Sequence, residues 1–298
     1  MFSRNKTSES TISYCDSVKA AADAIKTAKH IVIGIGAGMT AAGGLNYSDP
    51  ALAKKWYPEY YAMGKKSIID IMSGFWPTSI NKQNAAAFWG FWAKHIYHIR
   101  YEPEALTPYI DLFRIVGGKN HFICSTNVDG QLEKAGFEDS CIFAPQGDYA
   151  LLQCEKPCSN DVYTNKEIVD AMFSNMASPL EIRKEDIPFC PRCGSFLMPN
   201  LRCDSRYVEK SHMRNAKPYE RFLFEAVETE SVLLELGVGY NTPGIIRFPF
   251  ESITENYPSV TLIRVNLSDA AVPDRIADRA VSIKDDVGKA LSDIIQNL

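Results

Sequence analysis

The sequence predicts an α/β fold that is built on a parallel sheet, with a smaller helical and metal-binding domain beside it. Three observations support this prediction. Helical and short apolar segments alternate along most of the chain, a strand at 30–36 runs into a glycine-rich turn, and cysteine pairs interrupt the alternation between 150 and 210. Short apolar runs between helices are typical of strands buried on both faces of a parallel sheet.

The composition is that of an ordinary globular enzyme. The chain has 298 residues, of which 46% are hydrophobic and 23% charged, with a net charge of −4. This length suits one large domain or two modest ones. The acidic balance argues against nucleic acid or an anionic membrane as a partner. The polar N-terminus has no apolar signal region, and no apolar run reaches the roughly 20 residues of a membrane span, so we expect a cytoplasmic protein.

The first elements follow from periodicity. Residues 16–29 are alanine-rich with helical spacing and lead into the strand at 30–36. Residues 51–103 are rich in aromatic side chains and are broken by Pro58 and Pro77. Because proline interrupts helices, this stretch is expected to be an insertion of several helices that packs over the sheet.

The α/β alternation resumes near residue 105. We expect helices at 105–116, 131–135, 218–230 and 284–297, and strands at 121–124, 141–144, 232–236 and 260–265. The nucleotide-binding domain is therefore expected to comprise residues 1–50, 104–150 and 211–298, with a metal-binding module at 151–210.

The turn Gly34-Ile35-Gly36-Ala37-Gly38 is a candidate phosphate site. Glycines let backbone N–H groups approach a pyrophosphate without an intervening Cβ, and a following helix N-terminus adds positive potential. The turn departs from the dinucleotide fingerprint G-x-G-x-x-G because Met39 holds the sixth position. The alternative is a tight turn that binds nothing.

Polar residues follow two of the predicted strands. Asn127 and Asp129 come directly after the strand at 121–124, and Gln146 follows the strand at 141–144. Ligands of open α/β sheets bind outside the carboxyl ends of the strands, so both turns are expected to face one crevice. Alternatively, Asn127 and Asp129 only satisfy backbone groups of their turn.

Four cysteines form two short pairs, Cys154 with Cys158 and Cys190 with Cys193, and 31 residues separate the pairs. Four thiolates bind zinc in a closed tetrahedral site, so the expected role is structural. Cys203 is close enough in sequence to compete as a ligand. The alternative is a module that has lost its metal and is held by packing alone.

Taken in order, the motifs resemble those of the sirtuins, a family of NAD-dependent enzymes. The family carries GAG-x-S, T-Q-N-I-D, His-Gly, paired cysteines, a G-T-S strand end and a late asparagine-containing strand. The counterparts here are Gly36-Ala37-Gly38-Met39-Thr40, Ser125-Thr126-Asn127-Val128-Asp129, Gln146-Gly147, the cysteine pairs, Gly237-Val238-Gly239 and Val265-Asn266. The resemblance spans most of residues 16–295 and implies a Rossmann-like sheet of six parallel strands, the sirtuin fold, with a cleft between it and the smaller domain.

The resemblance implies that NAD is the co-substrate. Asn127 would position the nicotinamide ribose, Asp129 would bind the carboxamide or support its pocket, and Asn266 would reach the adenosine ribose. Gly237 and Gly239 would line the pyrophosphate path. The full set of implied cofactor-binding residues is Gly36, Ala37, Gly38, Thr40, Asn127, Asp129, Gln146, Gly237, Gly239, Asn266, Asp286 and Val287, the last two at the adenine end.

Gln146 stands where the family usually carries a catalytic histidine. In sirtuin deacetylation a base must take a proton from a ribose hydroxyl, and histidine suits that task because it titrates near neutrality. Glutamine forms hydrogen bonds but does not titrate. We therefore expect cleavage of NAD to survive and deacylation to be weak, which predicts a protein ADP-ribosyltransferase. The alternatives are a lysine deacylase with another base and a non-catalytic module that binds NAD or ADP-ribose.

A second departure lies at residues 44–49, where the family's G-I-P-D-F-R loop is replaced by Gly-Leu-Asn-Tyr-Ser-Asp. Both departures resemble the macrodomain-linked class M sirtuins. That resemblance implies a lipoylated glycine-cleavage-H-like carrier as the protein substrate, and a macrodomain ADP-ribose hydrolase acting in reverse. It also implies a catalytic arginine after the zinc module, beside Asn127 and Gln146. Arg202 is the candidate and Arg206 the alternative; a solvated surface arginine is the other interpretation of either.

Another histidine can be considered as a base or metal ligand. His95 and His98 lie three residues apart in a predicted helix, which places them on one face. We expect them to be partly buried or surface helix residues rather than a metal pair.

Overall fold

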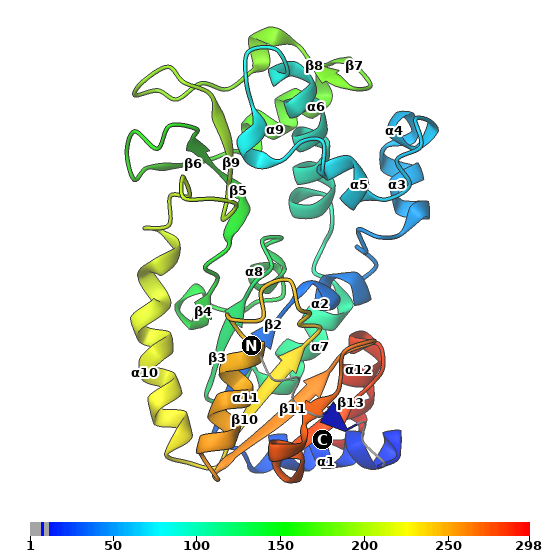
Figure 1. The fold of residues 1–298 in the computed structure, drawn as a ribbon, viewed down its shortest axis with the longest axis vertical. Helices are drawn as coiled ribbons and strands as arrows, with labels where there is room; N and C mark the ends of the chain where they lie inside the picture. The colour runs from blue at the N-terminus through cyan, green and yellow to red at the C-terminus, as the bar shows by residue number, and fades with distance from the viewer. Residues whose placement is uncertain (1–6, 9–11) are drawn as a thin grey trace.

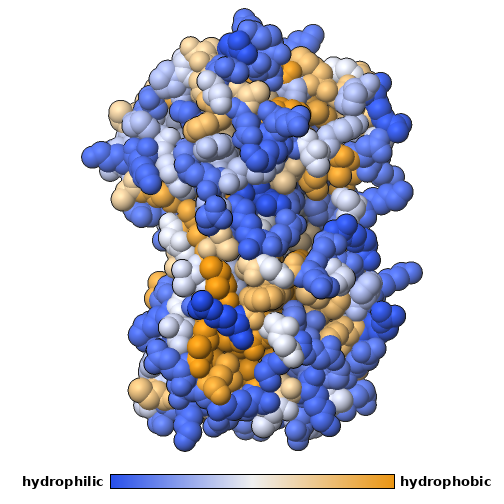
Figure 2. Space-filling model, turned by 180° about the vertical axis from the view of Figure 1, so that it is seen from behind, coloured by the Kyte–Doolittle hydropathy of each residue, from blue (hydrophilic) through white to orange (hydrophobic). Residues whose placement is uncertain are grey.

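The computed structural model describes residues 7–8 and 12–298 and confirms the predicted α/β fold. A large parallel sheet with its helices forms one lobe, and short strands and helices form a smaller lobe above it (Figure 1). Seen from behind, the two lobes meet at a narrower waist (Figure 2). Residues 1–6 and 9–11 of the polar N-terminal segment, where no signal peptide is expected, lie outside the described residues. No helix in the described part of the chain combines the length and apolar character that a membrane crossing requires.

The large lobe contains the sheet and the helices that cover it. Its elements are α1 (Tyr14–Thr27), β2 (His30–Ile35), α2 (Ala37–Ala42), α7 (Thr107–Val116), β3 (His121–Ser125), α8 (Gln131–Lys134), β4 (Ile142–Phe143), α10 (Ala216–Val227), β10 (Ser231–Leu236), α11 (Arg247–Asn256), β11 (Val260–Val265), β13 (Ala280–Ile283) and α12 (Val287–Asn297). Near the chain's start, β1 (Thr7–Ser8) pairs with β12 (Val272–Pro273).

The small lobe is built from two separate stretches of chain. The first contributes α3 (Pro50–Trp56), α4 (Pro58–Ala62), α5 (Ile68–Met72), α6 (Ala85–Ile96) and a π-helical turn at Tyr97–Tyr101. The second contributes β5 (Gly147–Cys154), β6 (Val162–Thr164), α9 (Lys166–Ser174), β7 (Met176–Ser178), β8 (Glu181–Ile182) and β9 (Leu197–Leu201).

The six strands of the main sheet run in the order β13-β11-β10-β2-β3-β4, and every neighbouring pair is parallel. From β2 the chain moves to β3 and β4 on one side, then returns to β10 on the other side. The strand order therefore reverses between β2 and β10. In sheets of this kind ligands bind at such a switch point, outside the carboxyl ends of the strands.

Helices cover both faces of this sheet. Alternate strand residues such as Ile31 and Ile33 pack against α1, α7 and α12 in one hydrophobic cluster. The residues between them, such as Val32 and Leu233, pack against α10 and α11 in another. Because both faces are buried, the strands are apolar throughout, which is why they could be recognised in the sequence.

Several boundaries differ from the prediction. The strand expected at 141–144 is only Ile142–Phe143, since a 3-10 turn at Asp139–Cys141 precedes it. Helix α11 and the edge strand β13 were not predicted. The α11 sequence, RFPFESITEN, carries a proline and bulky aromatic residues near its start, which are poor helix signals, and β13 has only four residues.

One hydrophobic cluster joins the two stretches of the small lobe. Aromatic residues of α6 such as Phe88 and Trp92 pack with Leu152 of β5, Met172 of α9 and Leu197 of β9. The helical insertion therefore packs mainly on the strands of the cysteine-bearing segment. We propose that the two stretches form one folding unit.

His95 lies at the centre of this aromatic core. Its ring is fully buried, with Nε2 3.0 Å from the Tyr149 hydroxyl and Nδ1 3.3 Å from the Tyr57 hydroxyl. Burial lowers the pKa of His95 from 6.5 to about 3, with a smaller contribution from the nearby His98. His95 is therefore neutral in the folded protein throughout the physiological range.

This buried histidine predicts a loss of stability in mild acid. Below pH 6.5 the unfolded chain binds a proton at His95 that the folded chain does not bind until about pH 3. The free energy of unfolding should fall by about 1.4 kcal/mol per pH unit in that window. Urea unfolding of wild type and His95→Gln at pH 7.5 and pH 5.5 measures this. The variant should lose about 1.4 kcal/mol less than wild type between the two pH values, and an equal loss would contradict the assignment.

Candidate functional site

A cleft of about 580 Å³ opens at the carboxyl end of the sheet, between the two lobes. Most of the residues predicted from the sequence line it: Gly36, Ala37, Gly38, Asn127, Gln146, Arg202, Gly237, Gly239, Asn266, Asp286 and Val287. Thr40 and Asp129 are not among the lining residues and lie buried beside them.

The lining residues follow the order of the strands. Asp286 comes after β13, Asn266 after β11, Gly237 after β10, Gly36 after β2 and Asn127 after β3. Neighbouring strands lie about 4.8 Å apart, so these groups are spread along an elongated cleft. The glycine turns occupy its middle, at the switch point, and suit a pyrophosphate. If a pyrophosphate binds in the middle, the two halves of an extended ligand would lie at the Asn127 end and at the Asp286 end.

The two glycine turns touch through their backbones. The N–H of Gly38 donates to the Gly237 carbonyl at 2.9 Å. A Cβ at Gly38 would lie 2.7 Å from Gly237 Cα, and one at Gly36 would lie 2.7 Å from the Gly237 oxygen. Gly237 also has φ +61°, a conformation that favours glycine. Glycine is therefore required on both turns, because the turns after β2 and β10 lie too close together for side chains between them.

Asn127 is held firmly by its amide nitrogen. Nδ2 lies 3.0 Å from the Gly36 carbonyl, 3.0 Å from Thr40 Oγ1 and 2.9 Å from the Tyr109 hydroxyl. No hydrogen bond to Asn127 Oδ1 is found among the described residues. Because Nδ2 is fully engaged, the oxygen is the group that Asn127 offers to a ligand in the cleft.

Thr40, Tyr109 and Asp129 form a buried network behind Asn127. The Thr40 hydroxyl donates to Asp129 Oδ2 at 2.5 Å and lies 2.8 Å from the Tyr109 hydroxyl. Burial raises the pKa of Asp129, while the hydrogen bonds from Thr40 and from the Gln131 N–H act in the opposite direction. Burial also raises the pKa of Tyr109 well above its ordinary value. Tyr109 was not singled out in the sequence, because one tyrosine in an amphipathic helix carries no distinguishing pattern.

Gln146 and Arg202 are joined through their backbones. The Arg202 N–H donates to the Gln146 carbonyl at 2.9 Å, and Arg202 Nε donates to the Pro145 carbonyl at 3.0 Å. The guanidinium also pairs with Glu209 at 2.5 Å and stacks on Tyr207, 4.6 Å from the ring centroid. Both residues therefore line the cleft from one corner, where Gly147 has φ +111° and any Cβ would collide with the Asn200 carbonyl.

The other end of the cleft is organised by side chains that bond to backbone. Asn266 Oδ1 accepts from the N–H groups of Ser268 and Asp269, and its Nδ2 donates to the Val238 carbonyl at 2.9 Å. Asp286 accepts from the Lys289 N–H and caps α12. Asn266 therefore shapes two loops as well as lining the cleft.

The remaining candidates lie elsewhere. Arg206 bonds to Asp204 and to the Thr78 carbonyl and does not line the cleft. Asp129 lines a second cavity of about 410 Å³, which meets the first at Asn127 and Val128. His98 stacks on Trp56 and pairs with Glu102 at 2.7 Å.

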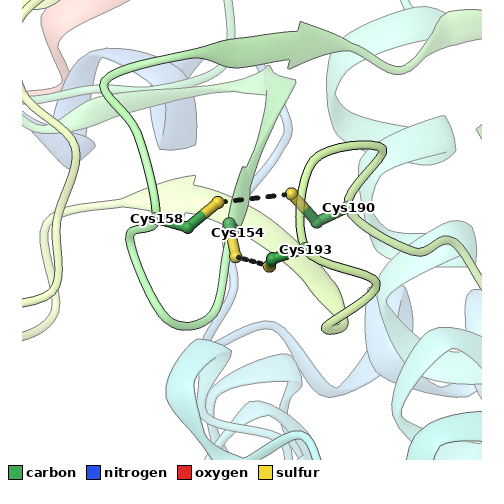
Figure 3. A group of neighbouring side chains, drawn as sticks. All are labelled: Cys154, Cys158, Cys190 and Cys193. Atoms are coloured by element: carbon green, nitrogen blue, oxygen red, sulfur yellow. Dashed lines mark hydrogen bonds between the residues drawn. The ribbon is translucent and has the colours of Figure 1, made fainter.

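The four cysteines of the small lobe converge on one point. Cys154 and Cys158 come from the end of β5 and the loop after it, and Cys190 and Cys193 from the loop before β9 (Figure 3). All four sulfur atoms lie within 4.8 Å of one another, with 3.5 Å between Cys154 and Cys193 and 3.6 Å between Cys158 and Cys190. Zinc–sulfur bonds of about 2.3 Å in a tetrahedron place sulfurs roughly 3.8 Å apart, so the group fits zinc.

The metal would be structural. Four thiolates leave no open position for a substrate or water, and the group lies outside the residues that line the cleft. Cys203, the competing ligand in the sequence, is not part of the group. Hydrogen bonds from Ser195 lower the pKa of Cys193 to about 6, which favours the thiolate.

We expect one zinc ion per chain and a folding dependence on it. Cys158→Ser should lose the metal and unfold at a lower temperature, because a structural zinc site contributes folding free energy. Elemental analysis and thermal melts measure both effects. Cys203→Ser is the control and should keep one zinc per chain; loss of zinc from that variant would show that the ligand set is wrong.

Comparison with known proteins gives two relatives by sequence, and no family model matches the chain. The chain is 27% identical over 277 residues to a protein ADP-ribosyltransferase of Staphylococcus aureus, covering 92% of this chain and 85% of that protein. It is 28% identical over 291 residues to a Fusarium oxysporum f. sp. cubense protein named a probable bifunctional ADP-ribose hydrolase/ADP-ribosyltransferase. That match covers 92% of this chain but only 47% of the relative, so the chain spans about half the relative's length.

The solved structures that resemble the chain include Sir2 enzymes. One, solved to explain the mechanism and regulation of Sir2 enzymes, is 23% identical with a TM-score of 0.57 and covers 95% of this chain and 97% of that one. A Sir2 homologue in complex with ADP-ribose gives 0.58 at 17% identity, with 93% and 95% covered. At these identities the likeness establishes the fold. The chain thus has the sirtuin fold and is related in sequence to two proteins whose names include ADP-ribosyltransferase.

Proposed function

We propose that the chain is an NAD-dependent protein ADP-ribosyltransferase, which moves ADP-ribose from NAD to a protein acceptor and releases nicotinamide. The observation that carries the proposal is that Gln146, which does not titrate, lines the same cleft as Asn127 and Arg202. Cleavage of NAD requires an oriented ribose and stabilised charge, whereas deacylation also requires a base. The names of both sequence relatives support the transferase.

The residues of the cleft have distinct roles in this proposal. NAD supplies the C1′–nitrogen bond that breaks and the ADP-ribose that is transferred. Asn127 presents Oδ1 to a ribose hydroxyl or to the incoming nucleophile, because its nitrogen is held by Thr40, Tyr109 and Gly36. Gln146 holds ribose hydroxyls by hydrogen bonds. Arg202, whose guanidinium also pairs with Glu209, attracts an acidic acceptor to this part of the cleft.

The transfer balances without a further reactant. The bond between C1′ and the nicotinamide nitrogen breaks, and nicotinamide leaves with the bonding electrons as a neutral molecule. The nucleophilic atom of the acceptor forms the new bond to C1′ and gives up its proton, if it carries one, to solvent.

We further propose that the acceptor is a lipoylated glycine-cleavage-H-like carrier and that a macrodomain hydrolase reverses the modification. The support for the carrier is the resemblance to class M sirtuins in Gln146, in the segment 44–49 and in Arg202. The support for the hydrolase is the name of the Fusarium relative, which joins ADP-ribose hydrolase and transferase in one chain.

Intact-protein mass spectrometry tests this proposal. The chain is incubated with NAD and the carrier, with and without lipoyl, and the lipoylated form alone should gain one ADP-ribose. Loss of lipoyl with formation of O-acyl-ADP-ribose would instead identify a deacylase. Asn127→Ala should reduce the transfer by about 100-fold or more, as removal of an active-site polar group does elsewhere. Asn256→Ala, on the exposed end of α11, is the control and should transfer normally.

Tyr109→Phe is expected to lower kcat about tenfold, because one hydrogen bond that orients Asn127 is lost. KM for NAD should change little, since Tyr109 is fully buried and does not line the cleft. Steady-state kinetics of nicotinamide release measure both constants. Tyr219→Phe removes a hydroxyl from another buried tyrosine, in the cluster beneath α10, and should leave kcat unchanged. An unchanged kcat in Tyr109→Phe would count against the role of the network.

A further inference from the structure

Four charged side chains form a buried cluster where α11 packs on the sheet. Arg247, Arg264 and Glu235 are fully buried and Glu251 is 8% exposed. Arg264 lies closest to the two carboxylates, with Nε 2.8 Å from Glu235 and Nη2 2.9 Å from Glu251. Arg247 is 3.8 Å from Glu235 and 3.9 Å from Glu251. The carboxylates are therefore engaged mainly by Arg264. Nη1 and Nη2 of Arg247 are directed to other partners, and its buried Nε has no hydrogen-bond partner among the described residues.

Those partners are backbone carbonyls of two loops that line the cleft. Arg247 Nη1 donates to the Val238 carbonyl at 2.8 Å, and Nη2 donates to the Asp269 carbonyl. Val238 lies in the loop after β10 and Asp269 in the loop after β11, and both residues line the cleft. The planar guanidinium thus bridges two loops with a rigid geometry that the single ammonium of lysine does not reproduce.

Two further contacts involve these loops. Tyr240, in the first loop, stacks over its guanidinium at 4.3 Å. Asn266 donates to the same Val238 carbonyl that Arg247 binds, at 2.9 Å. Arg264, by contrast, donates to the Ala271 carbonyl at 2.8 Å, and Ala271 does not line the cleft. Within one cluster, therefore, Arg247 binds the backbone of residues that line the cleft, and Arg264 binds the backbone of a residue outside it.

We propose that Arg247 is a positioning residue for the adenosine half of NAD, acting through the carbonyl groups of Val238 and Asp269. This inference rests on the proposed use of NAD. Arg247 does not touch the ligand, since it is fully buried and does not line the cleft. It holds the β10 and β11 loops at a fixed separation before the ligand arrives, so less loop ordering has to accompany binding.

Arg247→Lys and Arg264→Lys are a matched pair that tests the role. Each keeps a positive charge in the same buried cluster, so both should lower the melting temperature. Calorimetric titration with ADP-ribose, and separately with AMP, should give about tenfold weaker binding for Arg247→Lys, the size expected for one lost charge-assisted hydrogen bond. Arg264→Lys should bind both ligands like wild type. In kinetics, Arg247→Lys should raise KM for NAD by a similar factor and leave kcat at saturating NAD unchanged.

The outcomes separate this inference from the proposed function. Wild-type affinity for ADP-ribose in Arg247→Lys, or an equal loss in Arg264→Lys, would overturn the positioning role. Failure of wild type to bind ADP-ribose would instead overturn the proposed function. If Arg247→Lys does not fold alone, saturating ADP-ribose should restore its melting transition by mass action, because the ligand then orders the loops that the arginine held. No restoration would also overturn the inference.

Discussion

The direct backbone contact between the turns after β2 and β10 is the constraint on which the cleft depends. It requires a missing side chain at Gly36, Gly38 and Gly237, and it lies where the strand order of the sheet reverses. The positions of the other lining residues follow the order of the strands on either side of this contact. Asn127 and Gln146 follow the strands on one side, and Asn266 and Asp286 follow those on the other. The sheet alone therefore separates the Asn127 end of the cleft from the Asp286 end.

The two ends are held by different physical means. At the Asn127 end, the Gly36 carbonyl and the hydroxyls of Thr40 and Tyr109 hold the Asn127 amide. The carboxyl of Asp129 accepts from Thr40 behind them in the same buried network. Burial raises the pKa of Asp129 in that network, and its hydrogen-bond donors oppose the rise. At the other end, a buried cluster of full charges lies under the loops, and Arg247 reaches the backbone of both. Glutamine at position 146 fits this division, because its amide is able to form hydrogen bonds at the Asn127 end without adding a titrating group.

The sequence was sufficient for those features that are local or periodic. Buried strands such as Val260–Val265 were predicted to the residue, because a strand buried on both faces is uniformly apolar. Most of the residues that were expected after strands also line one cleft, since parallel strands bring their carboxyl ends to one edge, but Asp129 does not line it. Partners far away in the chain could not be predicted. Tyr109 and Arg247 act through contacts that depend on how α7 and α11 pack, and no spacing pattern indicates them. The helical insertion was expected to pack over the sheet, but it shares its hydrophobic core with the cysteine segment of the small lobe.

That shared core has a consequence for the order in which the protein is made. Helix α6 ends at Ile96, but strand β9, which packs with it, ends only at Leu201. During synthesis, the apolar face of α6 therefore lacks part of its packing partner until about a hundred further residues have been added. Adding them takes on the order of ten seconds. Long-range contacts of this kind slow folding and leave apolar surface open in the meantime. Metal capture can complete only after Cys193 has emerged, so the small lobe matures late, although its first helices are among the earliest parts of the chain to appear.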